Sequence, residues 1–206
     1  MTQPSEPDAL GILWMLRLDR PLPVGPGPSI PATFQRAGPE TATELAHAMQ
    51  LNHPDRVLQR FAIGRHCYIA RVEGKLAAYG WITFDREGIG ELGLTLRLNT
   101  GEAYIWDCAT LPAYRGQRLY PSLLAHMLGE LQHAGLQRIW IGTDADNLPS
   151  QSGVALVGCQ PILEIILSQN GGFLSRGRPG VPFQDVLDAH YALFGNRDTA
   201  RIIMAE

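Results

Sequence analysis

Cysteine, lysine and long apolar runs are scarce in this 206-residue sequence. The three cysteines, Cys67, Cys108 and Cys159, lie far apart and form no C-x-x-C pair, so the pattern supports neither a disulfide framework nor a zinc site. We expect free thiols in a reducing compartment. No run reaches the roughly 18 apolar residues of a membrane span. The first residues also lack a basic stretch followed by an apolar one, which argues against a secretory signal and favours a cytoplasmic protein.

A basic surplus is missing as well. The formal net charge is −3, and Lys75 is the sole lysine. Proteins that bind nucleic acids usually carry an excess of positive charge, so we expect no nucleic-acid partner. Hydrophobic residues make up 45% of the chain and charged residues 18%, which is ordinary for a globular protein. We therefore expect one domain over 32–206, preceded over 1–31 by an extension and a Pro/Gly linker.

Hydrophobic periodicity predicts alternating strands and helices after the linker at 21–31. The expected strands span 32–37, 66–72, 76–84, 92–98, 102–110, 138–143 and 160–169. The expected helices span 39–49, 55–63, 147–157 and 183–194, and a further helix with Pro121 in its first turn ends at Gly135. This alternation indicates an α/β protein.

Turn residues suggest how these elements connect. We expect one hairpin between 66–72 and 76–84, and another between 92–98 and 102–110. A right-handed crossover would set strand 138–143 parallel to strand 102–110. The apolar segment 11–18 fits an added strand or a short buried helix. Residues 1–9 should be frayed, and 171–180 should form a Gly/Arg loop.

The most informative segment is 106–124, WDCATLPAYRGQRLYPSLL. An apolar strand runs through a short loop directly into an amphipathic helix. Backbone N–H groups and the positive end of the helix dipole at such a helix start suit phosphate oxygens. Arg115 and Arg118 add two cations there. The alternative is an ordinary strand-to-helix turn with two solvated arginines.

This segment resembles the acyl-CoA loop of the GNAT superfamily of N-acetyltransferases, in which a V-x-P-like step precedes R/Q-x-x-G-x-G/A. Thr110-Leu111-Pro112 supplies the step and Arg115-Gly116 begins the loop, whereas Arg118 and Tyr120 stand where the pattern has glycines. A second motif of that superfamily is matched by Asn147, Ser150 and Gly158, with Cys159 in place of the aromatic residue. The resemblance covers about 32–169. It implies a central mixed sheet whose parallel strands splay apart, flanked by helices.

The resemblance implies an acyltransferase that uses acetyl-CoA, or another acyl-CoA, as cosubstrate and needs no metal. In the superfamily, pantetheine lies between the splayed strands, pyrophosphate lies on the loop, and the second motif lies near the pantetheine arm. The expected cofactor-binding residues are Ala109, Thr110, Leu111, Arg115, Gly116, Gln117, Arg118, Leu119, Tyr120, Asn147 and Ser150. The acceptor would be an amine of a small molecule or peptide that attacks the thioester directly in a ternary complex.

The catalytic candidates are Glu102, Asp107 and Tyr120. Either carboxylate would take the ammonium proton; on a regular strand the two face opposite sides, and a bulge would upset that parity. Glu102 could equally be a surface acid at a hairpin end, and Asp107 a buried, paired one. The usual tyrosine acid is absent because Val154 occupies its position, which leaves Tyr120, or Tyr104 or Tyr79, if solvent does not protonate the thiolate.

Other functions stay open at this level. The replaced glycines and Val154 fit a non-catalytic acyl-CoA-binding or sensing module, or a protein-interaction domain, on the same scaffold. The first third of the chain, 85–101 and the C-terminal tail would shape the acceptor pocket. The segment 175–180, SRGRPG, would contact an acidic substrate or the 3′-phosphate, or lie solvated at the surface. A homodimer could form by strand addition through 11–18.

Overall fold

The computed structural model describes residues 9–168, 170–195 and 201–205, so most of the expected frayed end at 1–9 lies outside the described residues. The strands are β1 Ala9–Arg17, β2 Thr33–Ala37, β3 His66–Val72, β4 Lys75–Thr83, β5 Arg86–Ile89, β6 Leu94–Arg97, β7 Glu102–Thr110, β8 Arg138–Asp144, β9 Gln160–Leu167, β10 Phe173–Gly177 and β11 Ile202–Met204. The helices are α1 Ala42–Ala48, α2 Asp55–Ala62, α3 Leu119–His133, α4 Leu148–Leu156 and α5 Phe183–Phe194, with 3-10 turns η1 Pro39–Thr41, η2 Gly90–Leu92 and η3 Pro112–Tyr114.

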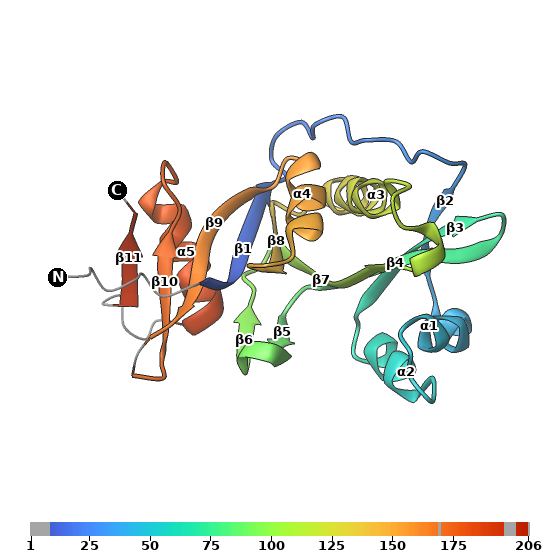
Figure 1. Cartoon of the computed structure of the whole chain (residues 1–206), viewed down its shortest axis with the longest axis horizontal. Coiled ribbons are helices and arrows are strands. Elements are labelled where there is room, and N and C mark those ends of the chain that lie inside the picture. Colours follow the sequence, from blue (N-terminus) through green and yellow to red (C-terminus); the bar gives the residue numbers. More distant parts are fainter. Residues whose placement is uncertain (1–8, 169, 196–200, 206) are drawn as a thin grey trace.

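One large mixed sheet organises the described residues, with strand order β11-β10-β9-β1-β8-β7-β4-β3-β2. Helices α3 and α4 lie on one face, and α1 and α2 lie on the other (Figure 1). The expected mixed α/β fold is therefore confirmed. The hairpin of β3 and β4 is confirmed too, as is the parallel pairing of β7 with β8.

The segment 11–18 forms β1, which resolves the choice between strand and helix. It pairs antiparallel with β8 on one side and β9 on the other. Because a central strand is covered on both faces, it is apolar along its length rather than alternating; Leu13 and Met15 face one core, and Ile12 and Trp14 the other. Both edges of β1 are occupied, so strand addition through this segment to a second copy is not available and that expected route to a dimer is wrong.

Two further expectations are wrong. The segment 92–98 does not pair with 102–110: β6 pairs with β5 in a separate small sheet, and β7 lies between β4 and β8. The expected Gly/Arg loop at 171–180 contains β10, which extends the large sheet beside β9. In both cases the partner is the strand that comes just before in the chain, β5 for β6 and β9 for β10.

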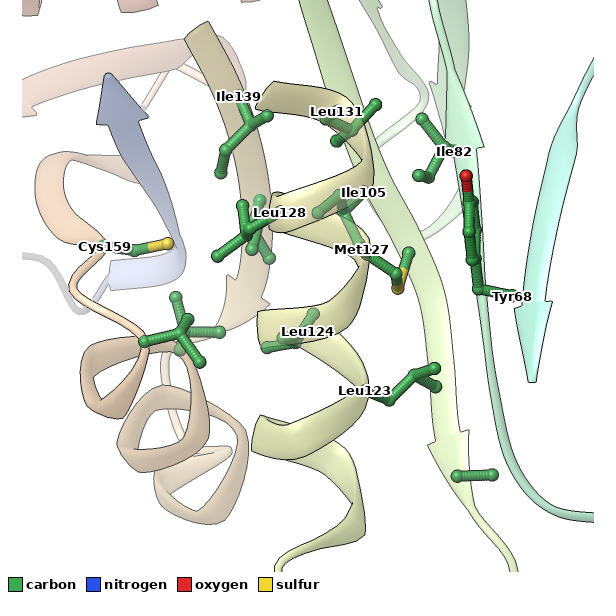
Figure 2. Close-up of a cluster of buried hydrophobic side chains, with 14 of the residues drawn as sticks. Tyr68, Ile82, Ile105, Leu123, Leu124, Met127, Leu128, Leu131, Ile139 and Cys159 are labelled. Atoms are coloured by element: carbon green, nitrogen blue, oxygen red, sulfur yellow. The ribbon is translucent and has the colours of Figure 1, made fainter. Parts of the chain in front are cut away.

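Helix α3 presents an apolar stripe to the sheet, as the periodicity predicts (Figure 2). The stripe consists of Leu123, Leu124, Met127, Leu128 and Leu131, each at most 2% exposed. It packs with Ile82, Ile105 and Ile139, which come from β4, β7 and β8. Since α3 follows β7 directly, this packing fixes where the loop before α3 stands relative to the sheet.

The linker at 21–31 has no regular structure, as expected, and it runs along α3 (Figure 1). The Ser29 N–H donates to the Gln117 carbonyl at 2.9 Å. The Ser122 hydroxyl donates to the Pro26 carbonyl at 2.8 Å. The linker is thereby attached to the loop and the first turn of α3. No helix in the described part of the chain is long and apolar enough to cross a membrane.

Candidate active site

Strands β7 and β8 diverge partway along the sheet. Their parallel pairing covers only Glu102–Ile105 and Arg138–Ile141 and then stops, although both strands continue. A cavity of about 580 Å³ lies in this wedge, with Tyr104–Cys108 on one wall and Ile141–Asp144 on the other. The helix-start residues Tyr120, Asn147 and Ser150 line it too, as do Arg60 and residues of the β5–η2 segment, Gly88, Ile89, Gly90 and Leu92.

The loop before α3 has the geometry of an anion cradle. Gly116 has φ 77° and Arg118 has φ 56°, so Arg118 adopts the left-handed conformation that glycine favours. The Arg115 and Arg118 side chains are exposed. Within the described residues, no hydrogen bond engages the backbone N–H groups of Gly116, Gln117, Arg118, Leu119 or Tyr120. Free donors at a helix start and two nearby cations together form a surface suited to phosphate.

Asn147 and Tyr120 bring the starts of α4 and α3 together. Asn147 caps α4, its side-chain oxygen accepting from the Ser150 N–H at 3.1 Å. The Ser150 and Tyr120 hydroxyl oxygens are 3.3 Å apart. Gly153 makes room for the Tyr120 ring, because a Cβ there would stand 2.6 Å from a ring carbon. Burial raises the pKa of the Tyr120 hydroxyl, so it carries its proton at neutral pH.

A β-bulge places Asp107. Tyr79 and Trp81 of β4 pair with Ala109 and Trp106, so Asp107 and Cys108 together oppose a single residue. Asp107 has φ 44°, and a bulge re-aims the side chain it carries. The Asp107 carboxylate pairs with Arg60 of α2 at 2.5 Å. Asp107 therefore lies on the α2 side of the sheet and lines the cavity.

Glu102 lies outside this cavity. It is 6% exposed, which contradicts the surface-acid alternative. It accepts from the Asn99 N–H at 3.1 Å and the Trp140 indole N–H at 3.3 Å, and Arg138 stands 3.5 Å away. It lines a second cavity of about 520 Å³ with Arg17 and Arg138. The bulge puts Glu102 and Asp107 on the same face, but only Asp107 reaches the wedge.

The remaining expected residues, Ala109, Thr110 and Leu111, lie at and just after the end of β7. Ala109 and Thr110 pair with β4, and the Leu111 N–H donates to the Ala77 carbonyl at 2.9 Å, so the Leu111 N–H is already engaged. None of these three residues lines the cavity. Arg115 reaches back to them, its Nε donating to the Thr110 carbonyl at 3.4 Å.

The segment 175–180 does not line the cavity; its first three residues belong to β10, and only Pro179 and Gly180 form an exposed turn. Arg176 and Arg178 both pair with the buried carboxylate of Glu164. No residue of the described C-terminal tail lines the wedge, whereas the first third of the chain and 85–101 do contribute. Sequence reasoning missed Arg60 and Asp144, because a single charged residue on a surface helix or at a strand end carries no local signal of a cavity.

The mixed sheet whose parallel strands splay, and the loop with free N–H groups at the start of the following helix, match the arrangement that the sequence resemblance implies. The model of the Acetyltransferase (GNAT) family matches residues 34–152, which is more than half of the chain. The protein belongs to this family. None of the curated proteins matches the chain.

Solved structures agree on the fold. An acetyltransferase of the GNAT family from Colwellia psychrerythraea superposes with a TM-score of 0.54 at 15% identity, over 75% of this chain and 53% of its own. The chain thus spans about half of that protein. An aminoglycoside acetyltransferase from an uncultured soil metagenomic sample, solved with trehalose, gives a TM-score of 0.50 at 10% identity, over 62% of this chain and 87% of its own.

Proposed function

We propose that the protein transfers an acetyl group from acetyl-CoA to an amine of a small molecule or peptide, by direct attack in a ternary complex. The observation that carries the proposal is the cavity between β7 and β8, which reaches from the starts of α3 and α4 to Asp107 on the opposite face. Two reactants entering from opposite faces would meet in one wedge. Holding them in line supplies much of the rate enhancement of a two-substrate reaction.

The cofactor side of the wedge would be formed by the loop before α3. The free N–H groups of 116–120, with Arg115 and Arg118, would hold the pyrophosphate. Asn147 and Ser150 would lie beside the pantetheine arm. Ala109, Thr110 and Leu111 would contact the arm from just outside the cavity, through groups other than the Leu111 N–H, which is bonded to Ala77. The two replaced glycines do not argue against this, because Arg118 keeps a left-handed backbone and Gly153 accommodates Tyr120. Another acyl-CoA would use the same contacts.

The chemistry would use Asp107 and Tyr120. Asp107 would accept the ammonium proton of the acceptor, directly or through a water molecule, so that the neutral amine attacks the thioester carbonyl. Tyr120, protonated at neutral pH, would donate a proton to the departing thiolate. Glu102 is not used, since it faces the second cavity. All three cysteines are free, which supports a reducing, cytoplasmic setting for this activity.

The test has two stages. Acetyl-CoA at about 100 times its dissociation constant should stabilise the fold by roughly 2.7 kcal/mol, seen as a raised Tm. Arg115→Ala/Arg118→Ala should remove this shift, while Arg56→Ala/Arg97→Ala, which deletes the same charge at exposed positions elsewhere, should keep it. Release of free CoA thiol with a panel of primary amines should then fall by about 10²–10⁴-fold in Asp107→Asn.

Failure of CoA release and failure of the Tm shift lead to different conclusions. A Tm shift without CoA release on any amine would refute catalysis and identify a non-catalytic acyl-CoA-binding module. No shift in the folded wild-type protein would refute cofactor binding and favour an interaction role.

A further inference from the structure

Arg60 is held against the acceptor side of the wedge by contacts on several sides. Its guanidinium lies over the Trp106 ring at 4.4 Å and over the Trp81 ring at 5.0 Å. Its Nη1 donates to Asp107 Oδ2 at 2.5 Å and lies 4.0 Å from the Met49 sulfur. The side chain is 24% exposed. Stacking on two indoles and one ion pair leave this guanidinium little rotational freedom.

Asp107 has few other constraints. Pairing between β7 and β8 ends at Ile105, so no backbone of β8 holds the bulge from that side. The Asp107 backbone is in the left-handed region, and its side chain is 31% exposed. Of its two carboxylate oxygens, Oδ2 is engaged by Arg60, and Oδ1 accepts no hydrogen bond from the described residues.

We propose that Arg60 is a positioning residue: it fixes the Asp107 carboxylate through Oδ2 and leaves Oδ1 to receive the proton of the acceptor amine. This inference rests on the proposed function, in which Asp107 takes that proton. A planar guanidinium is suited to the task because it stacks on the indoles and donates in its own plane at once, which the ammonium of a lysine does not do.

The two sides of the wedge should respond differently to the loss of Arg60. Arg60 comes from α2, on the face opposite α3 and its loop (Figure 1). Its loss should lower kcat for amine transfer, because a misplaced proton acceptor costs on the order of 10–100-fold in rate. The KM for acetyl-CoA should be unchanged, since the residues of the loop before α3 keep their contacts.

The experiment compares Arg60→Met, Arg60→Lys, Asp107→Asn and the double variant Arg60→Met/Asp107→Asn with the wild type. CoA thiol release is followed with benzylamine, spermidine and an unblocked alanyl peptide, and the best acceptor is used for kcat and KM. The matched control is Arg71→Met, which removes an arginine paired with Glu44 at 2.6 Å, away from the wedge. Urea unfolding of the same variants measures whether Arg60 and Asp107 are coupled in the folded protein.

The expected result is a roughly 10–100-fold lower kcat in Arg60→Met, partial recovery in Arg60→Lys, and no further loss when Arg60→Met is added to Asp107→Asn. Arg71→Met should match the wild type. Independent effects of Arg60→Met and Asp107→Asn on unfolding would show that the pair does not form, and would overturn the proposal. If the two substitutions are coupled in stability but their losses in kcat multiply, Arg60 has only a structural role, and the proposal is overturned too. If the wild type acetylates no amine, the proposed function fails and this role falls with it.

Discussion

The loop before α3 contains two residues whose substitution should change the stability of the fold in opposite directions, because both have a left-handed backbone. Gly116 and Arg118 both have positive φ, 77° and 56°. A Cβ built on Gly116 meets no atom within 4 Å. Substitution at Gly116 therefore adds backbone strain without steric overlap, and Arg118→Gly removes strain that is already present.

The magnitude follows from two opposing contributions. A residue with a Cβ in the left-handed region costs about 1–2 kcal/mol in the folded state. Glycine also makes the unfolded chain more flexible, which favours the unfolded state and offsets about 0.4–1 kcal/mol of that difference. We expect Arg118→Gly to raise the free energy of unfolding by about 0.5–1 kcal/mol, and Gly116→Ala to lower it by a similar amount. In a chain of this size each change corresponds to a Tm shift of roughly 1–4 °C.

The assay is urea unfolding without ligand, repeated with acetyl-CoA. In its absence the two variants should move the midpoint in opposite directions at an unchanged m-value. In its presence Arg118→Gly should gain less stability than the wild type, because a cation at the loop is gone. A lower midpoint for Arg118→Gly, or an unchanged midpoint for Gly116→Ala, would refute the view that this loop stores backbone strain in a glycine-like conformation.

Two other predictions concern the wedge and the surface. Gly153→Ala places a Cβ 2.6 Å from the Tyr120 ring, so it should separate Tyr120 from Ser150, cost about 1–3 kcal/mol of stability and raise the KM for acetyl-CoA; kinetics indistinguishable from the wild type would contradict this packing. The hydrogen bond from Arg71 holds the pKa of Glu44 below its usual value of 4.5. A carboxylate whose pKa is lower in the folded state stabilises the fold at pH values above its unfolded-state pKa, and this stabilisation is lost as the pH falls through the folded-state pKa. Glu44→Gln should therefore be less stable than the wild type at pH 7 and equally stable in strong acid. Urea titrations under both conditions will show this.

The local elements of this protein were readable from the sequence wherever one face of an element is apolar. The stripe of α3, the hairpin of β3 and β4, and the helix that starts after Asn147 depend on neighbours a few residues away, so periodicity and residue type suffice. The pairing of β6 with β5, and of β10 with β9, was not readable. Both are hairpins between neighbouring strands, but β5 and β10 each contain Gly, which is depleted in strands, and the turn before β7 carries the same residues whether or not it closes a hairpin.

The sequence by itself predicted the fold class, and it predicted a loop suited to phosphate because a strand, an Arg-Gly turn and an amphipathic helix in succession place backbone N–H groups at a helix start. That the phosphate belongs to an acyl-CoA is what the resemblance to the GNAT superfamily implies. Only the tertiary structure decided which carboxylate reaches the wedge. Glu102 and Asp107 stand on the same strand, but the bulge turns Asp107 into the cavity beside Arg60, and Arg138 and Trp140 hold Glu102 at the other end. That outcome depends on where α2 packs and where β7 parts from β8, contacts between segments that are distant in the chain.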